Sequence, residues 1–150
     1  MKLERVELFV VRLPLKRAYE TSGSRETHQT RVLCRVESQG VVGWGESVAP
    51  EQPWYSGETP KTIRYALEEF IVPQLFKADL RSADDTSREL AWIREHRMAK
   101  ATIEMAVWDL FAKREGKPLS ALLGGTRARI LCGVAIGIQP AWPSGLRSIW

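Results

Sequence analysis

The chain has 150 residues, 44% of them hydrophobic and 27% charged, which is typical of a soluble globular protein with one hydrophobic core. Its net charge of +4 comes from arginines and lysines that are interleaved with acidic residues, so we exclude a nucleic-acid-binding protein. Because no apolar run approaches the roughly 20 residues of a membrane helix, we also exclude a membrane protein.

The first eleven residues alternate polar and apolar side chains, unlike the continuous apolar stretch of a secretory signal, so we expect a cytoplasmic protein. Cys34 and Cys132 lie far apart in apolar stretches. They imply no disulfide framework, and we predict two buried, small hydrophobic residues. The two histidines, His28 and His96, show no zinc-ligand spacing, so no metal site is predicted.

Three strands are predicted in the first third of the chain. Alternating apolar residues predict a strand from Lys2 to Leu13, ended by Pro14. Residues 16–29 are rich in Thr, Ser and Gly and predict a loop. Strands over 30–37 and 41–47, joined by a short turn, complete an antiparallel meander.

Helices are predicted after a second loop over residues 48–59. The first begins at Pro60 and is interrupted or ended by Pro73, and the second covers residues 80–93. The third, over 97–115, carries two apolar stripes. We therefore expect it to be covered on most of its circumference, between two layers. A short helix follows through Leu123.

The segment Ile130–Ile138, with the sequence ILCGVAIGI, predicts a strand buried on both faces, as in a parallel sheet. No later strand is available to pair with it. The order of strands, then helices, then one unpaired strand predicts the α+β class.

Several motifs, taken in their order and spacing, resemble the enolase superfamily in its muconate-lactonizing subgroup. They are Met1-Lys2-Leu3-x-x-Val6-Glu7-Leu8, Gly43-Trp44-Gly45-Glu46, His96–Ala101 followed by Glu104–Asp109, Leu122–Gly125, and Cys132-Gly133-Val134. Within the subgroup, the sequence looks most similar to o-succinylbenzoate synthases and N-acylamino acid racemases. The resemblance covers residues 1–138.

The resemblance implies an α+β capping domain over residues 1–125, with a three-stranded antiparallel meander followed by helices. Residues 126–138 would be the first strand of a truncated TIM barrel. Residues 139–150 lose the family pattern, and we hypothesise that a shifted reading frame produced this tail. A fragment from a partial gene is the competing explanation.

In this family, barrel carboxylates hold a Mg²⁺ ion, and flanking lysines move a proton next to a substrate carboxylate. The resemblance places all of these residues beyond residue 150. We therefore expect no catalytic residue, no metal ligand and no cofactor in this chain, and no activity from it alone. The parent enzyme would dehydrate a small carboxylate to o-succinylbenzoate or racemise an N-acylamino acid. A cycloisomerase or a dipeptide epimerase is the alternative.

The resemblance also implies two specificity loops, residues 19–25 and 49–55, that close over the substrate. The candidate substrate-lining residues are Tyr19, Gly23, Pro50, Tyr55 and Ala135. Gly23 departs from the aromatic residue that is usual at its position in the closest relatives. The alternative interpretation is four ordinary loop residues and, for Ala135, a core residue.

Two other patterns do not predict catalysis. Glu46 and Asp109 are the only carboxylates in strongly apolar settings, but they match structural positions of the capping domain. The pair Gly43-x-Gly45 is too short for a dinucleotide-binding motif. The alternative function is a stand-alone binding module, in which the unpaired strand supports self-association.

Overall fold

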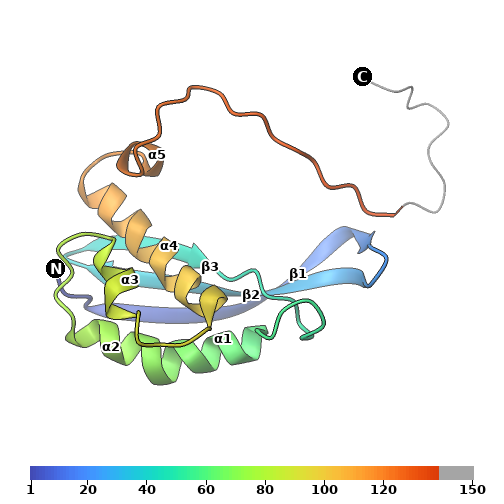
Figure 1. Ribbon diagram of the computed structural model, residues 1–150, viewed down its shortest axis with the longest axis horizontal. Helices are drawn as coiled ribbons and strands as arrows, with labels where there is room; N and C mark the ends of the chain where they lie inside the picture. The colour runs from blue at the N-terminus through green and yellow to red at the C-terminus, as the bar shows by residue number, and fades with distance from the viewer. Residues whose placement is uncertain (139–150) are drawn as a thin grey trace.

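The computed structural model describes residues 1–138, so the predicted aberrant tail lies outside the described residues. Strands β1 (Arg5–Glu20), β2 (Arg25–Ser38) and β3 (Val41–Glu46) form an antiparallel sheet in the order β1-β2-β3. The helices follow in the chain and pack against the sheet (Figure 1). The predicted meander and α+β class are confirmed.

The ribbon of β1 and β2 is longer than predicted. Residues 16–20 continue β1, and β2 begins at Arg25, so the predicted loop over 16–29 is wrong except at its turn. Pro14 does not end the strand, because β1 is an edge strand and its register with β2 shifts between Pro14 and Tyr19. The polar residues there pair through their backbones.

The inner face of the sheet forms the base of the core. Val32, Cys34 and Val36 alternate along β2 and are fully buried. The core above them consists mainly of Ile63, Leu67, Ile71, Leu75, Leu90, Ile103, Val107 and Leu110. The alternation of apolar residues in the sequence therefore identified the buried face of β2 correctly.

The first helical region starts as predicted and continues past its predicted end. Thr59 caps α1 (Pro60–Ala66) in a capping box with Thr62. A π-helical segment, η1 (Leu67–Ile71), leads directly into α2 (Val72–Lys77). Pro73 lies in the first turn of α2, where the wider π turn before it accommodates a residue without an N–H. The predicted interruption at Pro73 is therefore wrong.

The predicted helix over 80–93 is reduced to α3 (Asp85–Glu89). The carboxylate of Asp85 accepts hydrogen bonds from the backbone N–H groups of Arg81 (2.7 Å) and Ser82 (3.1 Å). This local side-chain bonding stabilises a turn over residues 81–84 in place of a helical start.

Helix α4 (Arg97–Arg114) agrees with its predicted bounds to within one residue. The stripe from Ile103 to Phe111 is buried against the sheet and the other helices. The second stripe is covered only in part, because Ala112 is buried and Met98 and Trp108 are half-buried, whereas Ala101 is exposed and Met105 is 43% exposed. The helix is therefore not covered on both sides along its length, as a position between two layers would require.

Two glycines allow β3 to lie directly against α4. A Cβ added at Gly43 would lie 2.0 Å from the carbonyl oxygen of Ala106, and one at Gly45 would lie 2.0 Å from that of Thr102. The helix backbone cannot rotate away as a side chain can. The Gly-x-Gly pair therefore serves helix–sheet packing.

Side chains of α4 also cover the outer edge of β3. The carboxylate of Asp109 accepts a hydrogen bond from the backbone N–H of Trp44 (2.8 Å), and Lys113 donates to the carbonyl of Val42 (3.0 Å). Asp109 and Lys113 pair with each other at 2.6 Å. These bonds satisfy backbone groups that an uncovered sheet edge would expose.

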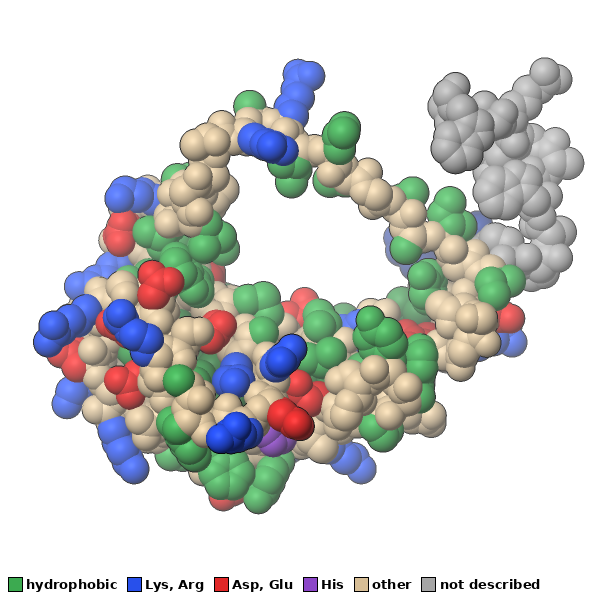
Figure 2. All heavy atoms as spheres, viewed as in Figure 1, with side chains coloured by type: hydrophobic (Ala, Val, Ile, Leu, Met, Phe, Trp, Pro, Cys, Tyr) green, Lys and Arg blue, Asp and Glu red, His purple; other side chains and the backbone are tan. Residues whose placement is uncertain are grey.

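After α5 (Leu119–Leu122), residues 126–138 run in an extended path that arches over the body and ends near the tip of the β1–β2 ribbon (Figure 1). No strand is formed within them, although the backbone N–H of Ile138 bonds to the carbonyl of Glu20 at the end of β1. Figure 2 shows open space beneath them, and Leu131 and Val134 are largely exposed. The predicted burial of this segment, and of Cys132 within it, is therefore wrong.

Within residues 1–138, no helix is long and apolar enough to cross a membrane.

Burial distinguishes the two cysteines, which are both free thiols. Desolvation raises the pKa of Cys34 from 9.0 to about 12.

The raised pKa of Cys34 makes the stability of the protein depend on pH. Above pH 9 the unfolded chain loses a proton that the folded chain keeps. We therefore expect this thiol to lower the free energy of unfolding by about 1.4 kcal/mol per pH unit as pH rises toward 12. Urea unfolding from pH 8 to 10.5 measures this slope, which should be shallower in Cys34→Ala. An equal slope in both proteins contradicts the prediction.

Candidate functional site

The two predicted loops meet at the far end of the β1–β2 ribbon. They enclose an open, polar cavity of about 360 Å³. Its lining consists of residues 23–31 from the β1–β2 turn and β2, and Pro50, Glu51, Gln52 and Trp54 from the loop after β3. Two segments that are separated in sequence by most of β2 and all of β3 thus form one concave surface.

The structure brings only two of the predicted substrate-lining residues into this cavity. Gly23 and Pro50 line it, and a Cβ added at Gly23 would be in van der Waals contact with the ring of Trp54 at 3.6 Å. Tyr55 lies outside the lining and is 78% exposed, with its ring 5.8 Å from that of Trp54. The substrate-lining roles of Gly23, Pro50 and Tyr55 stay predictions.

Tyr19 takes part in a different contact, and Ala135 is exposed in the segment that makes it. The extended segment 126–138 returns to the end of β1, where the backbone N–H of Ile138 donates to the carbonyl of Glu20 (2.7 Å). A Cβ added at Gly137 would lie 3.0 Å from Cδ2 of Tyr19. The first loop therefore touches the end of the segment that resembles the first barrel strand. The roles of Tyr19 and Ala135 toward a substrate also stay predictions.

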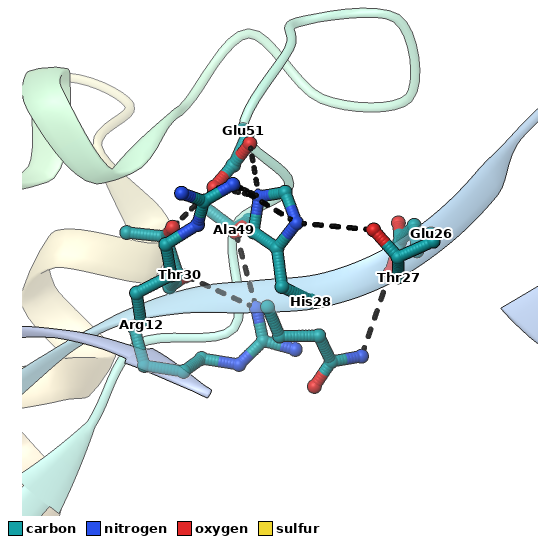
Figure 3. A network of polar contacts seen from close by, with 9 residues as sticks. Arg12, Glu26, Thr27, His28, Thr30, Ala49 and Glu51 are labelled. Carbon is teal, nitrogen blue, oxygen red and sulfur yellow. Dashed lines mark hydrogen bonds and ion pairs between the residues drawn. The ribbon is translucent and has the colours of Figure 1, made fainter. Parts of the chain in front are cut away.

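A polar network on the cavity wall joins both strands of the ribbon to the second loop (Figure 3). Nε2 of His28 lies 2.8 Å from Nη2 of Arg12 and 3.1 Å from Oε1 of Glu51. The hydroxyl of Thr30 donates to the same carboxylate oxygen, and that of Thr27 lies 3.3 Å from Nδ1 of His28. These contacts connect β1, β2 and the loop after β3.

The network stabilises the charged form of Glu51. Hydrogen bonding from Thr30 has the largest effect and lowers the pKa of this carboxyl group; desolvation partly opposes it, and the neighbouring His28 and Arg12 each add a smaller lowering. Glu51 is therefore an ionised acceptor at neutral pH.

Sequence reasoning missed this network. Arg12, His28 and Glu51 belong to no motif, and Thr30 was only the start of a predicted strand. The sequence carries no signal for these contacts, because they depend on how the second loop folds back over β2. The contact of Trp54 with the first loop likewise depends on the folding of the second loop and has no local sequence signal.

The two carboxylates that were considered as a catalytic pair serve separate structural contacts. Glu46 lies 3.4 Å from Arg31, whereas Asp109 binds the edge of β3. Within residues 1–138, no three His, Cys, Asp or Glu side chains are grouped so that they could hold a metal ion. The described residues therefore do not fit the Mg²⁺ that the family resemblance implies, and no step is assigned through that ion.

Comparison with known proteins identifies the family to which this fold belongs. Residues 5–124 match the family described as the mandelate racemase / muconate lactonizing enzyme, N-terminal domain. The chain belongs to this family. Its three-stranded sheet and helices are thus the capping domain of an enolase-superfamily protein, as the sequence motifs predicted.

The chain is similar to curated relatives over nearly its whole length. It is 48% identical over 141 residues to an o-succinylbenzoate synthase of Geobacillus kaustophilus, covering 93% of this chain and 38% of the relative. It is 41% identical over 149 residues to an N-succinylamino acid racemase of Thermus thermophilus, covering 99% of this chain and 40% of the relative. The chain therefore spans about two fifths of these relatives.

A solved structure of an enolase-superfamily member from Listeria innocua has a TM-score of 0.87 and 31% identity to this chain. The match covers 94% of this chain and 38% of that one. The sheet and helices therefore have the same arrangement in both proteins.

Proposed function

We propose that this chain is the substrate-capping part of a metal-dependent lyase or racemase that acts next to a carboxylate. The parent enzyme is of the o-succinylbenzoate synthase or N-acylamino acid racemase type, and its substrate is a small carboxylate. The chain contributes the two loops that cover the substrate and exclude water. In this type of enzyme the catalytic residues lie on a barrel, so we expect the 150 residues by themselves to show no activity.

The observation that carries the proposal is the convergence of the two loops on one cavity. Gly23 and Trp54 bring the loops into contact, and Tyr19 contacts the segment that resembles the first barrel strand. In such a site, closing loops set specificity by the shape that they offer to the substrate. The names of the Geobacillus and Thermus relatives support the two reaction types.

A chimera tests the proposal. We would fuse residues 1–138 to the portion of the Geobacillus kaustophilus protein that follows its matched region. With Mg²⁺, we expect o-succinylbenzoate formation or N-succinylamino acid racemisation within about tenfold of the Geobacillus parent, since a well-fitted cap loses no more than about 1.4 kcal/mol of transition-state stabilisation. The 150-residue chain alone should show neither activity.

Two variants of the chimera test the role of the first loop. Tyr19→Ala should raise KM, whereas Tyr65→Ala, at an exposed position on α1, should not. A chimera that folds and stays inactive beside an active parent contradicts the proposal, as does activity of the chain alone.

The second candidate is a stand-alone binding module that associates with itself through residues 130–138. The observation that favours it is the exposure of this apolar segment, in which Leu131 and Ile130 are largely uncovered. Sedimentation of the chain alone, in the same set of experiments, separates the two candidates. One defined oligomer together with an inactive chimera supports the module.

A further inference from the structure

The second loop is connected to the rest of the protein at few points. Its first end is held by the backbone N–H of Ser47, which donates to Val32, and by Arg31, which donates to the carbonyl of Ala49 (3.4 Å). Between Ala49 and Ser56, Glu51 is the only residue in the described part of the chain that hydrogen-bonds to another element. The cavity-facing part of the loop thus has one polar anchor.

Nε2 of His28 is shared between two partners, because it lies 3.1 Å from Oε1 of Glu51 and 2.8 Å from Nη2 of Arg12. In the tautomer with its proton on Nε2, the imidazole donates to the Glu51 carboxylate, and Nδ1 can accept from Thr27 (3.3 Å) or Arg12 (3.2 Å). The hydroxyl of Thr30 supplies a second donor to the carboxylate. The positive charge of Arg12 on β1 offsets the negative charge of Glu51.

Three further charged groups on β2 line the cavity. Arg25 pairs with Glu20 at 3.5 Å, Glu26 hydrogen-bonds to Gln29 at 3.5 Å, and Arg31 donates to the backbone of the loop. None of the three forms an ion pair or hydrogen bond with Glu51 in the residues that the structure describes. Glu51 therefore depends on His28 and Thr30 for its position, and Arg12 contributes through His28.

We infer that Glu51 is a positioning residue, which holds the second specificity loop against β2 so that Trp54 stays over Gly23 and the cavity keeps its shape. Its relevance to catalysis rests on the proposed function, in which this loop covers the substrate. The effect of Glu51 on the structure of the loop does not depend on the proposed function, because every group involved belongs to this chain.

Hydrogen exchange of the 150-residue chain, read by mass spectrometry of peptic peptides, tests the inference. In Glu51→Ala, we expect amides of residues 48–58 to exchange on the order of tenfold faster, because a charge-assisted anchor is lost. Amides of α4 should exchange as in the wild type. Glu26→Ala is the matched control: it removes a carboxylate from the same cavity and should leave the loop unchanged.

Rescue by a conservative variant separates positioning from general packing. His28→Gln keeps an N–H donor for Glu51 and should retain slow exchange in the loop, whereas His28→Ala should accelerate it. In the wild type, loop protection, corrected for intrinsic exchange rates, should persist below pH 4.5 and fall as pH drops through the lowered pKa of Glu51. Glu51→Gln should lack this pH step.

Unchanged loop exchange in Glu51→Ala would overturn the inference, as would equal acceleration in the loop and in α4. The measurement uses no substrate and no barrel. Its outcome is therefore independent of the activity of the chimera, and the two proposals can fail separately.

Discussion

Replacing Gly45 by alanine is expected to lower the free energy of unfolding by about 3 kcal/mol or more. The added methyl group would lie 2.0 Å from the carbonyl oxygen of Thr102 and 2.9 Å from the backbone N of Ala106. Both atoms belong to the helix backbone, so α4 must move away from β3. That movement loosens the buried contacts of Ile103 and Leu110 in the core. Urea unfolding followed by circular dichroism measures the loss.

Gly57→Ala is the matched control for Gly45→Ala. No atom lies within 4 Å of a Cβ added at Gly57, and its φ is not in the left-handed region. Its free energy of unfolding should change by no more than about 1 kcal/mol. If Gly45→Ala is as stable as Gly57→Ala, the close approach of β3 to α4 is not a requirement of the fold.

Replacing Glu58 by alanine is expected to cost about 2 kcal/mol of unfolding free energy. The carboxylate of Glu58 accepts hydrogen bonds from the backbone N–H groups of Met98 (2.8 Å) and Ala99 (2.9 Å) in the first turn of α4. His96, at the N-cap position, has a left-handed backbone and makes no capping bond with its side chain. Glu58 therefore supplies both the acceptor and the negative charge that the helix N-terminus favours.

Two further variants identify the cause of the loss at Glu58. Glu58→Gln keeps one acceptor oxygen without the charge and should lose less stability than Glu58→Ala. Glu4→Ala removes an exposed carboxylate that makes no side-chain hydrogen bond among the described residues, and its stability should stay within about 0.5 kcal/mol of the wild type. Equal stability of Glu58→Ala and Glu4→Ala would show that the cap is unimportant.

For helix α4 and strand β2, the local sequence pattern was sufficient to predict the structure. The apolar period of α4 predicted its bounds to within one residue, and the alternation of Val32, Cys34 and Val36 predicted the buried face of β2. Both patterns record burial that repeats with the period of the element itself. The capping box at Thr59 is equally local, since it lies within four consecutive residues.

The wrong predictions have a common origin in missing neighbours. The ribbon beyond Pro14 is polar, so its strands are stabilised by pairing and not by burial. Ile130–Ile138 has the composition of a buried strand, but composition cannot supply the strands that would pair with it. The second stripe of α4 similarly leaves Ala101 and Met105 exposed, although its other members are half-buried or buried.

The sequence by itself determined the α+β class, the meander, the main helix and the membership of the enolase superfamily, because each follows from local periodicity or from motifs in fixed order. It also identified the two loops that meet at the cavity. Only the tertiary structure decided that Glu51 binds His28 and Thr30 and that Gly45 lies against the backbone of Thr102. Those contacts join residues more than twenty positions apart, and their geometry is set by the packing of whole elements.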